Sequence, residues 1–105
     1  MSLDVTLERR VEVYEANITH NLAAMAEGAG IYRHLWRPDE IGVETAGELI
    51  EPLRQGLLEL ESNPERFRAF DAENGWGTYD DFVPWVRRYL EACQLNPDAE
   101  IRISR

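Results

Sequence analysis

The sequence predicts an α+β protein in which three to four helices pack on one face of a small sheet formed by the N- and C-terminal strands. Residues near both ends of the chain alternate in polarity as strands do, and the residues between them follow the period of helices. The chain has 105 residues, 44% of them apolar, which suits one compact core. We therefore assign residues 1–105 to a single domain.

Each end of the chain is predicted to form a strand with one solvent-exposed face. The first strand runs from Val5 to Tyr14, and no structural role is assigned to residues 1–3. The side expected to be buried carries Val5, Leu7, Val11 and Val13, and in the C-terminal strand Ala99, Ile101 and Ile103. We expect these strands to pair. Their wet faces carry Arg10 and Glu12 on one strand and Glu100 and Arg102 on the other, so opposite charges are available whichever register is chosen.

The first half of the chain contains two predicted helical regions. An apolar stripe from Ile18 to Ala29 is interrupted at Gly28 and Gly30, and a further helical turn covers 31–36 before Pro38. Thr45 and Glu48 have the spacing of a capping box and open a helix that reaches Leu60. Pro52 lies inside this segment, so we expect either a kink or a start near Glu51.

The second half predicts two more helices. Asn63-Pro64-Glu65 has the residue types of a helix start and opens a short helix through Phe70. Thr78 with Asp81 caps a longer helix that ends before Asn96-Pro97-Asp98. The inner face of this helix carries Phe82, Val86, Tyr89, Leu90 and Cys93.

Composition excludes several classes of function. A net charge of -9 opposes binding to phosphate backbones, so we expect no nucleic-acid partner. All eleven basic residues are Arg, which excludes lysine Schiff-base chemistry. A single Cys, no signal peptide and no apolar run of membrane-spanning length indicate a cytoplasmic protein without a membrane partner. A two-stranded sheet is marginal alone, which favours completion by a second copy in a homodimer.

The segment 17–21 is the first candidate site. Asn17, Thr19, His20 and Asn21 crowd the passage from a strand into a helix. Such a position offers unpaired backbone N–H groups, so these residues are predicted to bind a small polar or anionic ligand. The alternative is that Asn17 or Thr19 caps the helix and the others satisfy local backbone groups.

The segment 74–79 is the second candidate site. Gly75 and Gly77 flank Trp76 and allow a close approach of another surface, while Trp76 and Tyr79 offer flat faces on which a ligand ring can stack; Asn74 adds a polar group. The alternative is a glycine turn that drops Trp76 into the core under the last helix.

Other chemistry-bearing residues give weaker signals. Arg37 could hold a carboxylate or phosphate, or form an ion pair with Asp39 or Glu40. His20 and His34 match no metal spacing, so we expect no metal and no cofactor. Cys93 falls on an apolar helix face and is expected to act as a small hydrophobic residue.

Four segments taken together resemble a family of small proteins found in bacterial and bacteriophage genomes, to which no activity is assigned. They are Asn17-Ile18-Thr19-His20-Asn21, Leu35-Trp36-Arg37-Pro38, Asn74 to Tyr79, and Asp98 to Arg105. The likeness covers the chain from about Tyr14 onward. It implies an intracellular setting and a phage or mobile-element origin, and it transfers no catalytic role.

Three functions follow as hypotheses. The first is a non-catalytic binding module in which 17–21 and 74–79 approach each other around one polar pocket. The second is an acidic interaction or inhibitor protein that occupies a basic host target. The third is an enzyme in which His20 is a general acid or base oriented by Asn17 or Asn21, and Arg37 or a helix N-terminus stabilises the charge that develops on the substrate.

Overall fold

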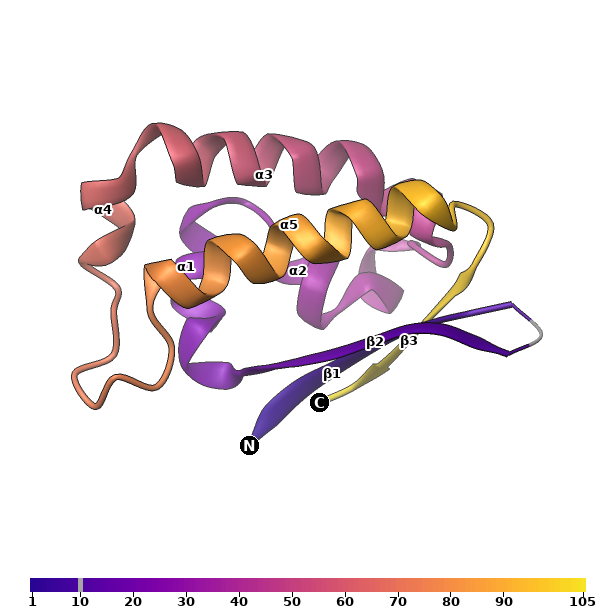
Figure 1. Cartoon of the computed structure of the whole chain (residues 1–105), viewed down its shortest axis with the longest axis horizontal. Helices are drawn as coiled ribbons and strands as arrows, with labels where there is room; N and C mark the ends of the chain where they lie inside the picture. The colour runs from indigo at the N-terminus through magenta and orange to yellow at the C-terminus, as the bar shows by residue number, and fades with distance from the viewer. Residues whose placement is uncertain (10) are drawn as a thin grey trace.

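The computed structural model describes residues 1–9 and 11–105 and has the predicted α+β architecture. Figure 1 shows the helices gathered on one side of a sheet that contains both ends of the chain. The sheet has three antiparallel strands in the order β2-β1-β3, formed by β1 (Ser2–Glu8), β2 (Glu12–Thr19) and β3 (Glu100–Ser104). The expected pairing of the chain ends is confirmed, since Val5 lies opposite Ile103 and Leu7 opposite Ile101.

The prediction of one continuous strand from Val5 to Tyr14 is wrong, because the chain reverses and forms a β1–β2 hairpin. Leu3, Val5 and Leu7 are buried on β1, whereas β2 turns its even-numbered residues to the helices and leaves Val11 and Val13 exposed at 70% and 38%. The turn lacks the Asn-Gly type of signal that marks a hairpin in a sequence. The predicted position of Arg10 on the wet face lies outside the described residues.

Short helical segments follow the hairpin. They are the 3-10 helix η1 (His20–Leu22), α1 (Ala23–Gly28), α2 (Tyr32–Trp36) and the 3-10 helix η2 (Pro38–Ile41). The expected helix from Ile18 is thus too long at its start, because Ile18 still belongs to β2 and Thr19 caps η1. The turn at 31–36 and its end before Pro38 are confirmed.

The longer helices begin at the predicted caps. The carboxylate of Glu48 accepts a hydrogen bond from the Thr45 N–H at 3.1 Å at the start of η3 (Ala46–Leu49), which leads into α3 (Ile50–Ser62). Pro52 therefore stands in the first turn of α3, where its missing N–H costs no helical bond. The Thr78 hydroxyl accepts from the Asp81 N–H at 3.3 Å and opens α5 (Tyr79–Leu95).

The core lies between the helices and one face of the sheet. In Figure 1, α3 and α5 run alongside each other, and α4 (Pro64–Arg68) turns the chain from α3 toward the loop before α5. All five predicted inward residues of α5 are buried. Tyr89 stacks on Tyr14 of β2 with ring centroids 5.9 Å apart, which fixes α5 to the sheet. Within the described part of the chain, no helix is long and apolar enough to cross a bilayer.

Candidate functional site

The two candidate segments meet. The Asn21 side-chain amide donates a 2.8 Å hydrogen bond to the backbone carbonyl of Trp76. Gly77 lies against Thr19 and Leu22, and a Cβ added there would come within 3.0 Å of the Thr19 methyl group. Figure 1 shows the loop between α4 and α5 beside the junction of β2 and η1. The expected proximity of the two segments is confirmed, and it depends on a glycine at 77 because of both the close approach and its φ of +107°.

The end of β2 is held in place from two sides. The Thr19 hydroxyl accepts a 3.3 Å hydrogen bond from the Asn21 N–H, which is the capping role foreseen for this segment. The Trp85 indole of α5 donates a 2.9 Å hydrogen bond to the carbonyl of Asn17. The side chain of Asn17 remains exposed beside this anchored backbone.

The loop that carries Trp76 is also fixed by its own contacts. The side-chain oxygen of Asn74 accepts a hydrogen bond from the Trp76 N–H at 2.9 Å. The Ala72 N–H donates to the backbone carbonyl of Gly77 at 3.1 Å. Gly75 has a φ of +78°, which suits glycine in this turn. The Trp76 side chain is 72% exposed, so the alternative in which it packs in the core is wrong.

Residues of both segments line an open groove of about 900 Å³. Its lining contains all four predicted residues of 17–21 and two of the three from 74–79. The polar, charged and aromatic lining residues are Ser2, Asn17, Thr19, His20, Asn21, Asn74, Trp76 and Asp81, and the others are Met1, Ile18, Leu22, Gly75 and Gly77. Five of these side chains are short, polar and uncharged: Ser2, Asn17, Thr19, Asn21 and Asn74. The groove thus combines hydrogen-bonding groups with one large flat apolar surface, as ligand sites commonly do.

His20 is oriented by a tryptophan, a contact that was not predicted from the sequence. The Trp36 indole N–H donates a 2.7 Å hydrogen bond to Nδ1 of His20. Since Nδ1 accepts, the neutral imidazole carries its proton on Nε2 and offers a donor. A ring held this way is poorly arranged to accept a proton through Nδ1, which weakens the case for His20 as a general base.

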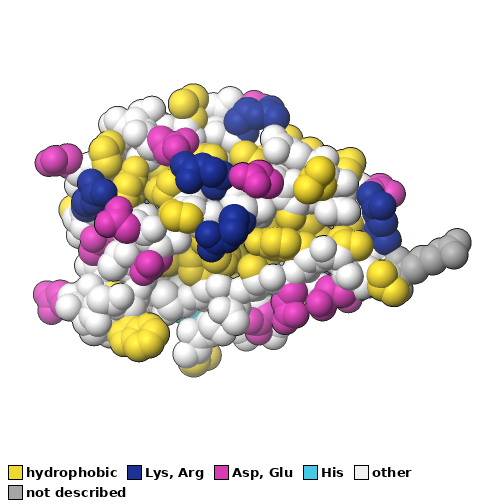
Figure 2. Space-filling model, in the orientation of Figure 1, with side chains coloured by type: hydrophobic (Ala, Val, Ile, Leu, Met, Phe, Trp, Pro, Cys, Tyr) yellow, Lys and Arg dark blue, Asp and Glu magenta, His cyan; other side chains and the backbone are white. Residues whose placement is uncertain are grey.

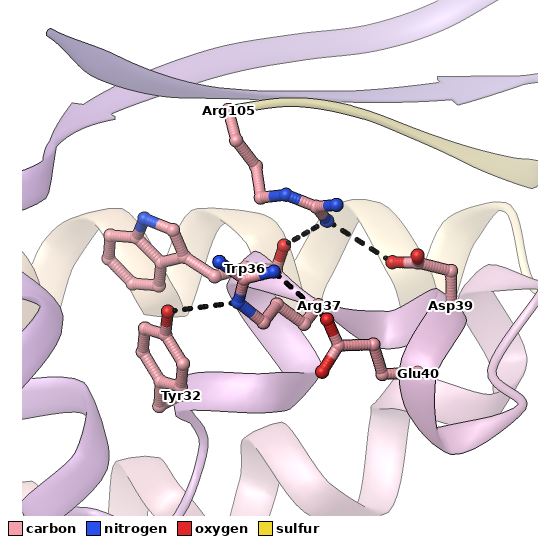
Figure 3. A network of polar contacts seen from close by, with 6 residues as sticks. All are labelled: Tyr32, Trp36, Arg37, Asp39, Glu40 and Arg105. Atoms are coloured by element: carbon pink, nitrogen blue, oxygen red, sulfur yellow. Dashed lines mark hydrogen bonds and ion pairs between the residues drawn. The ribbon is translucent and has the colours of Figure 1, made fainter.

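Arg37 does not line the groove. Its guanidinium donates to Glu40 at 2.9 Å and to the Tyr32 hydroxyl at 3.3 Å, so the ion-pair alternative is confirmed (Figure 3). Arg105 donates to the Trp36 carbonyl at 2.9 Å and to Asp39 at 3.2 Å. Tyr32 stacks on Trp36 with centroids 5.5 Å apart. These contacts support Trp36, and through it His20, from outside the groove.

Tyr79 is also absent from the lining of the groove. Its ring is buried at the start of α5 and its hydroxyl donates a 2.8 Å hydrogen bond to the carbonyl of Leu60. Arg68 lies over this ring at 4.8 Å. The start of α5 thus directs Tyr79 inward, toward α3, and away from the groove.

The remaining chemistry-bearing residues are remote from the groove or engaged. Burial raises the pKa of the Cys93 thiol to about 12, so it behaves as the small hydrophobic residue expected of it. Burial also lowers the pKa of His34, which lies on α2. Among the residues that the structure describes, no group of three or more His, Cys, Asp or Glu could hold a metal ion.

Two polar residues of the groove, Ser2 and Asp81, were not predicted from the sequence to lie there. Ser2 belongs to the segment that received no structural role, yet β1 begins there and Leu3 beside it is fully buried. Asp81 was interpreted only as a capping partner, and it does accept from the Thr78 hydroxyl at 3.0 Å. Its position in the first turn of α5, directly after the glycine loop, was the available signal that it also borders the groove.

Comparison with known proteins adds no name to this site. No protein-family model, curated protein or solved structure matches the chain. The resemblance to small bacterial and bacteriophage proteins therefore stays a prediction, and the function has to be argued from the groove itself.

Proposed function

We propose that this protein is a non-catalytic binding module whose ligand occupies the groove between the β2–η1 junction and the 74–77 loop. One observation carries the proposal: the Asn21 side chain fixes the backbone of Trp76 while the indole stays 72% exposed. A large aromatic side chain held on a rigid loop in contact with water loses little conformational entropy when it binds. Such residues commonly dominate the affinity of binding sites.

The polar groups around the indole support the same function. No protein hydrogen bond engages the side chain of Asn17, Nε2 of His20 or the amide nitrogen of Asn74, counting only partners within 1–9 and 11–105. Each of these groups can therefore bond to a ligand without first losing an internal contact. A ligand with several hydrogen-bonding groups and one flat face satisfies both parts of the groove.

Fluorescence of Trp76 tests the proposal directly. Trp36 and Trp85 are buried, so the quenching of tryptophan emission by acrylamide in the folded protein reports mainly on Trp76. We expect a screen of uncharged and anionic small molecules to yield ligands that protect Trp76 from quenching. Calorimetry on Trp76→Ala should then show affinity reduced by about tenfold or more, from the loss of one aromatic stacking contact.

Leu95→Ala is the matched control, because Leu95 is a large apolar side chain, 78% exposed, that does not line the groove. It should bind with unchanged affinity. A Trp76→Ala variant that binds every ligand as well as the parent chain would contradict the proposal.

A second candidate is an interaction protein with a basic partner, favoured by the acidic β1–β2 hairpin. Repulsion from Glu15 and Glu8 raises the pKa of Glu12 there, which marks a concentration of negative charge. On the face over the helices that Figure 2 shows, acidic and basic side chains are intermixed. Binding of a basic peptide that Glu12→Gln and added salt both weaken would support this function.

The homodimer is also a prediction, to be checked by light scattering.

A further inference from the structure

We propose that the ligand of the groove is an uncharged saccharide. This inference rests on the proposed function and specifies its ligand class. It draws on three features of the groove: its lack of basic side chains, its set of Asn amides and its exposed indole.

The charges around the groove disfavour an anionic ligand. No Arg side chain of the described residues lines it, and Asp81 contributes a carboxylate. The whole chain carries a net charge of -9. Phosphate and carboxylate groups are normally held by Arg forks or other positive groups, and here they would meet a negative field. An uncharged ligand avoids this repulsion, which removes nucleotides and acidic sugars from the expected class.

The amide groups match the hydroxyl pattern of a sugar. Asn17, Asn21 and Asn74 all line the groove. Asn21 uses its amide nitrogen on Trp76, which leaves its side-chain oxygen as an acceptor, whereas Asn74 uses its oxygen and keeps its amide nitrogen as a donor. Each sugar hydroxyl both donates and accepts, so adjacent hydroxyls are satisfied by this mixture of donors and acceptors.

The indole supplies the apolar half of the site. One face of a pyranose ring is lined by C–H groups, which carry a partial positive charge and pack favourably on the electron-rich face of an indole. Both backbone groups of Trp76 are hydrogen-bonded, its N–H to Asn74 and its carbonyl to Asn21, so the backbone that carries the exposed ring is held in place. A nucleobase could also stack on it, and the experiment separates the two.

The full chain should be applied to an array of immobilised neutral and acidic glycans. Detection should use a C-terminal tag, because Met1 lines the groove and the chain has no Lys for labelling. Hits are then measured in solution by isothermal titration calorimetry, whose signal does not depend on Trp76, beside uncharged nucleosides as a second set of probes. We expect saturable binding of a neutral oligosaccharide, little changed between low and high salt because no ion pair forms.

Variants decide where the sugar binds. Trp76→Ala should weaken the binding by about tenfold or more, Trp76→Phe should retain part of it, and Leu95→Ala should leave it unchanged. Absence of binding to every neutral glycan, or binding that Trp76→Ala does not weaken, overturns the saccharide assignment. If an uncharged nucleoside binds and is lost in Trp76→Ala, the saccharide assignment fails and the groove function stands. If Trp76→Ala leaves the binding of every saccharide and nucleoside unchanged, both the saccharide assignment and the proposed function of the groove fail.

Discussion

Two buried tyrosines differ in whether their hydroxyl has a partner. Tyr79 donates to the Leu60 carbonyl, whereas the Tyr89 hydroxyl is buried without a hydrogen bond to any described residue. Removing an unsatisfied buried hydroxyl relieves its desolvation cost, while removing a bonded one leaves a carbonyl without its partner. We expect Tyr89→Phe to leave the free energy of unfolding unchanged or raise it by about 1 kcal/mol, and Tyr79→Phe to lower it by about 1 kcal/mol.

Urea denaturation of the two variants, with the parent chain measured alongside, checks this pair. Each change deletes one oxygen from a buried ring, so the variants control for each other. Equal losses of stability in both would contradict the assigned hydrogen bonds.

The hydrogen bond from Trp36 to His20 predicts a single tautomer of the His20 ring, which can be tested by spectroscopy. In the parent chain the Trp36 indole holds the neutral His20 ring with its proton on Nε2. Trp36→Phe removes the donor, so the ring should populate both tautomers. Nitrogen-15 NMR of the imidazole measures this. Tyr32→Phe, which keeps the indole but loses the hydroxyl bonded to Arg37, should preserve the single tautomer; a mixture in the parent chain would refute the assignment.

At the level of single residues, the sequence predicted the local roles well. Thr45, Glu48, Thr78 and Asp81 form the expected caps, because a cap depends on neighbours a few positions away. The hydrogen bond between His20 and Trp36 could not be predicted from neighbouring residues. Its two members are sixteen positions apart and are joined only by the path of the chain through α1 and α2.

At the level of elements, α3 and the segment before α2 are in unusually close contact. A Cβ added to Gly56 of α3 would lie deep inside van der Waals contact with the Ile31 side chain. Ala favours a helix by about 1 kcal/mol over Gly, yet overpacking costs about 1–3 kcal/mol. We expect the steric cost to exceed the propensity gain, so that Gly56→Ala lowers the thermal midpoint, as followed by circular dichroism.

A double-mutant cycle separates the clash from the effect of the helix. Ile31→Ala alone should destabilise by creating a cavity, and the combination with Gly56→Ala should cost less than the sum of the two changes. Additive losses would show that the two residues do not compete for one space.

The helices were predicted better than the hairpin. The 3.6-residue stripe of α5 and its cap specify both its start and its buried face, whatever it packs against. The sequence between β1 and β2 contains no turn signature. Val11 and Val13 continue the apolar alternation of β1 but are exposed in the structure. Strand pairing is decided by contacts between distant residues, so a pattern of alternation alone did not locate the turn.

At the scale of the whole molecule, the packing of α5 on the sheet predicts how stability depends on pH. Burial raises the pKa of Tyr14, of Tyr89 and of Cys93, the last to about 12. The folded state therefore keeps these protons at pH values where the unfolded chain has lost them. Their contribution to stability is complete below the ordinary values of about 8.5 for Cys and 10 for Tyr, and is lost as the pH rises toward the folded values.

Thermal midpoints measured from neutral pH to about pH 11 test this sign, and should fall above about pH 9. Cys93→Ala will lower stability at every pH through its cavity, but its midpoint should fall less steeply in the alkaline range because one titrating group is gone. An identical slope in the variant would exclude Cys93 from the effect.

The sequence by itself determined the class of fold, the starts of the two capped helices and the positions of the two polar segments, because these depend on composition and on the spacing of neighbouring residues. Only the tertiary structure decided that Trp76 is exposed, that Asn21 holds its loop, and that Arg37 and Tyr79 face elsewhere. The reason is physical. The groove is lined by segments more than fifty positions apart in the sequence. The side chains that face it are those that the packing of the rest of the chain does not bury or engage.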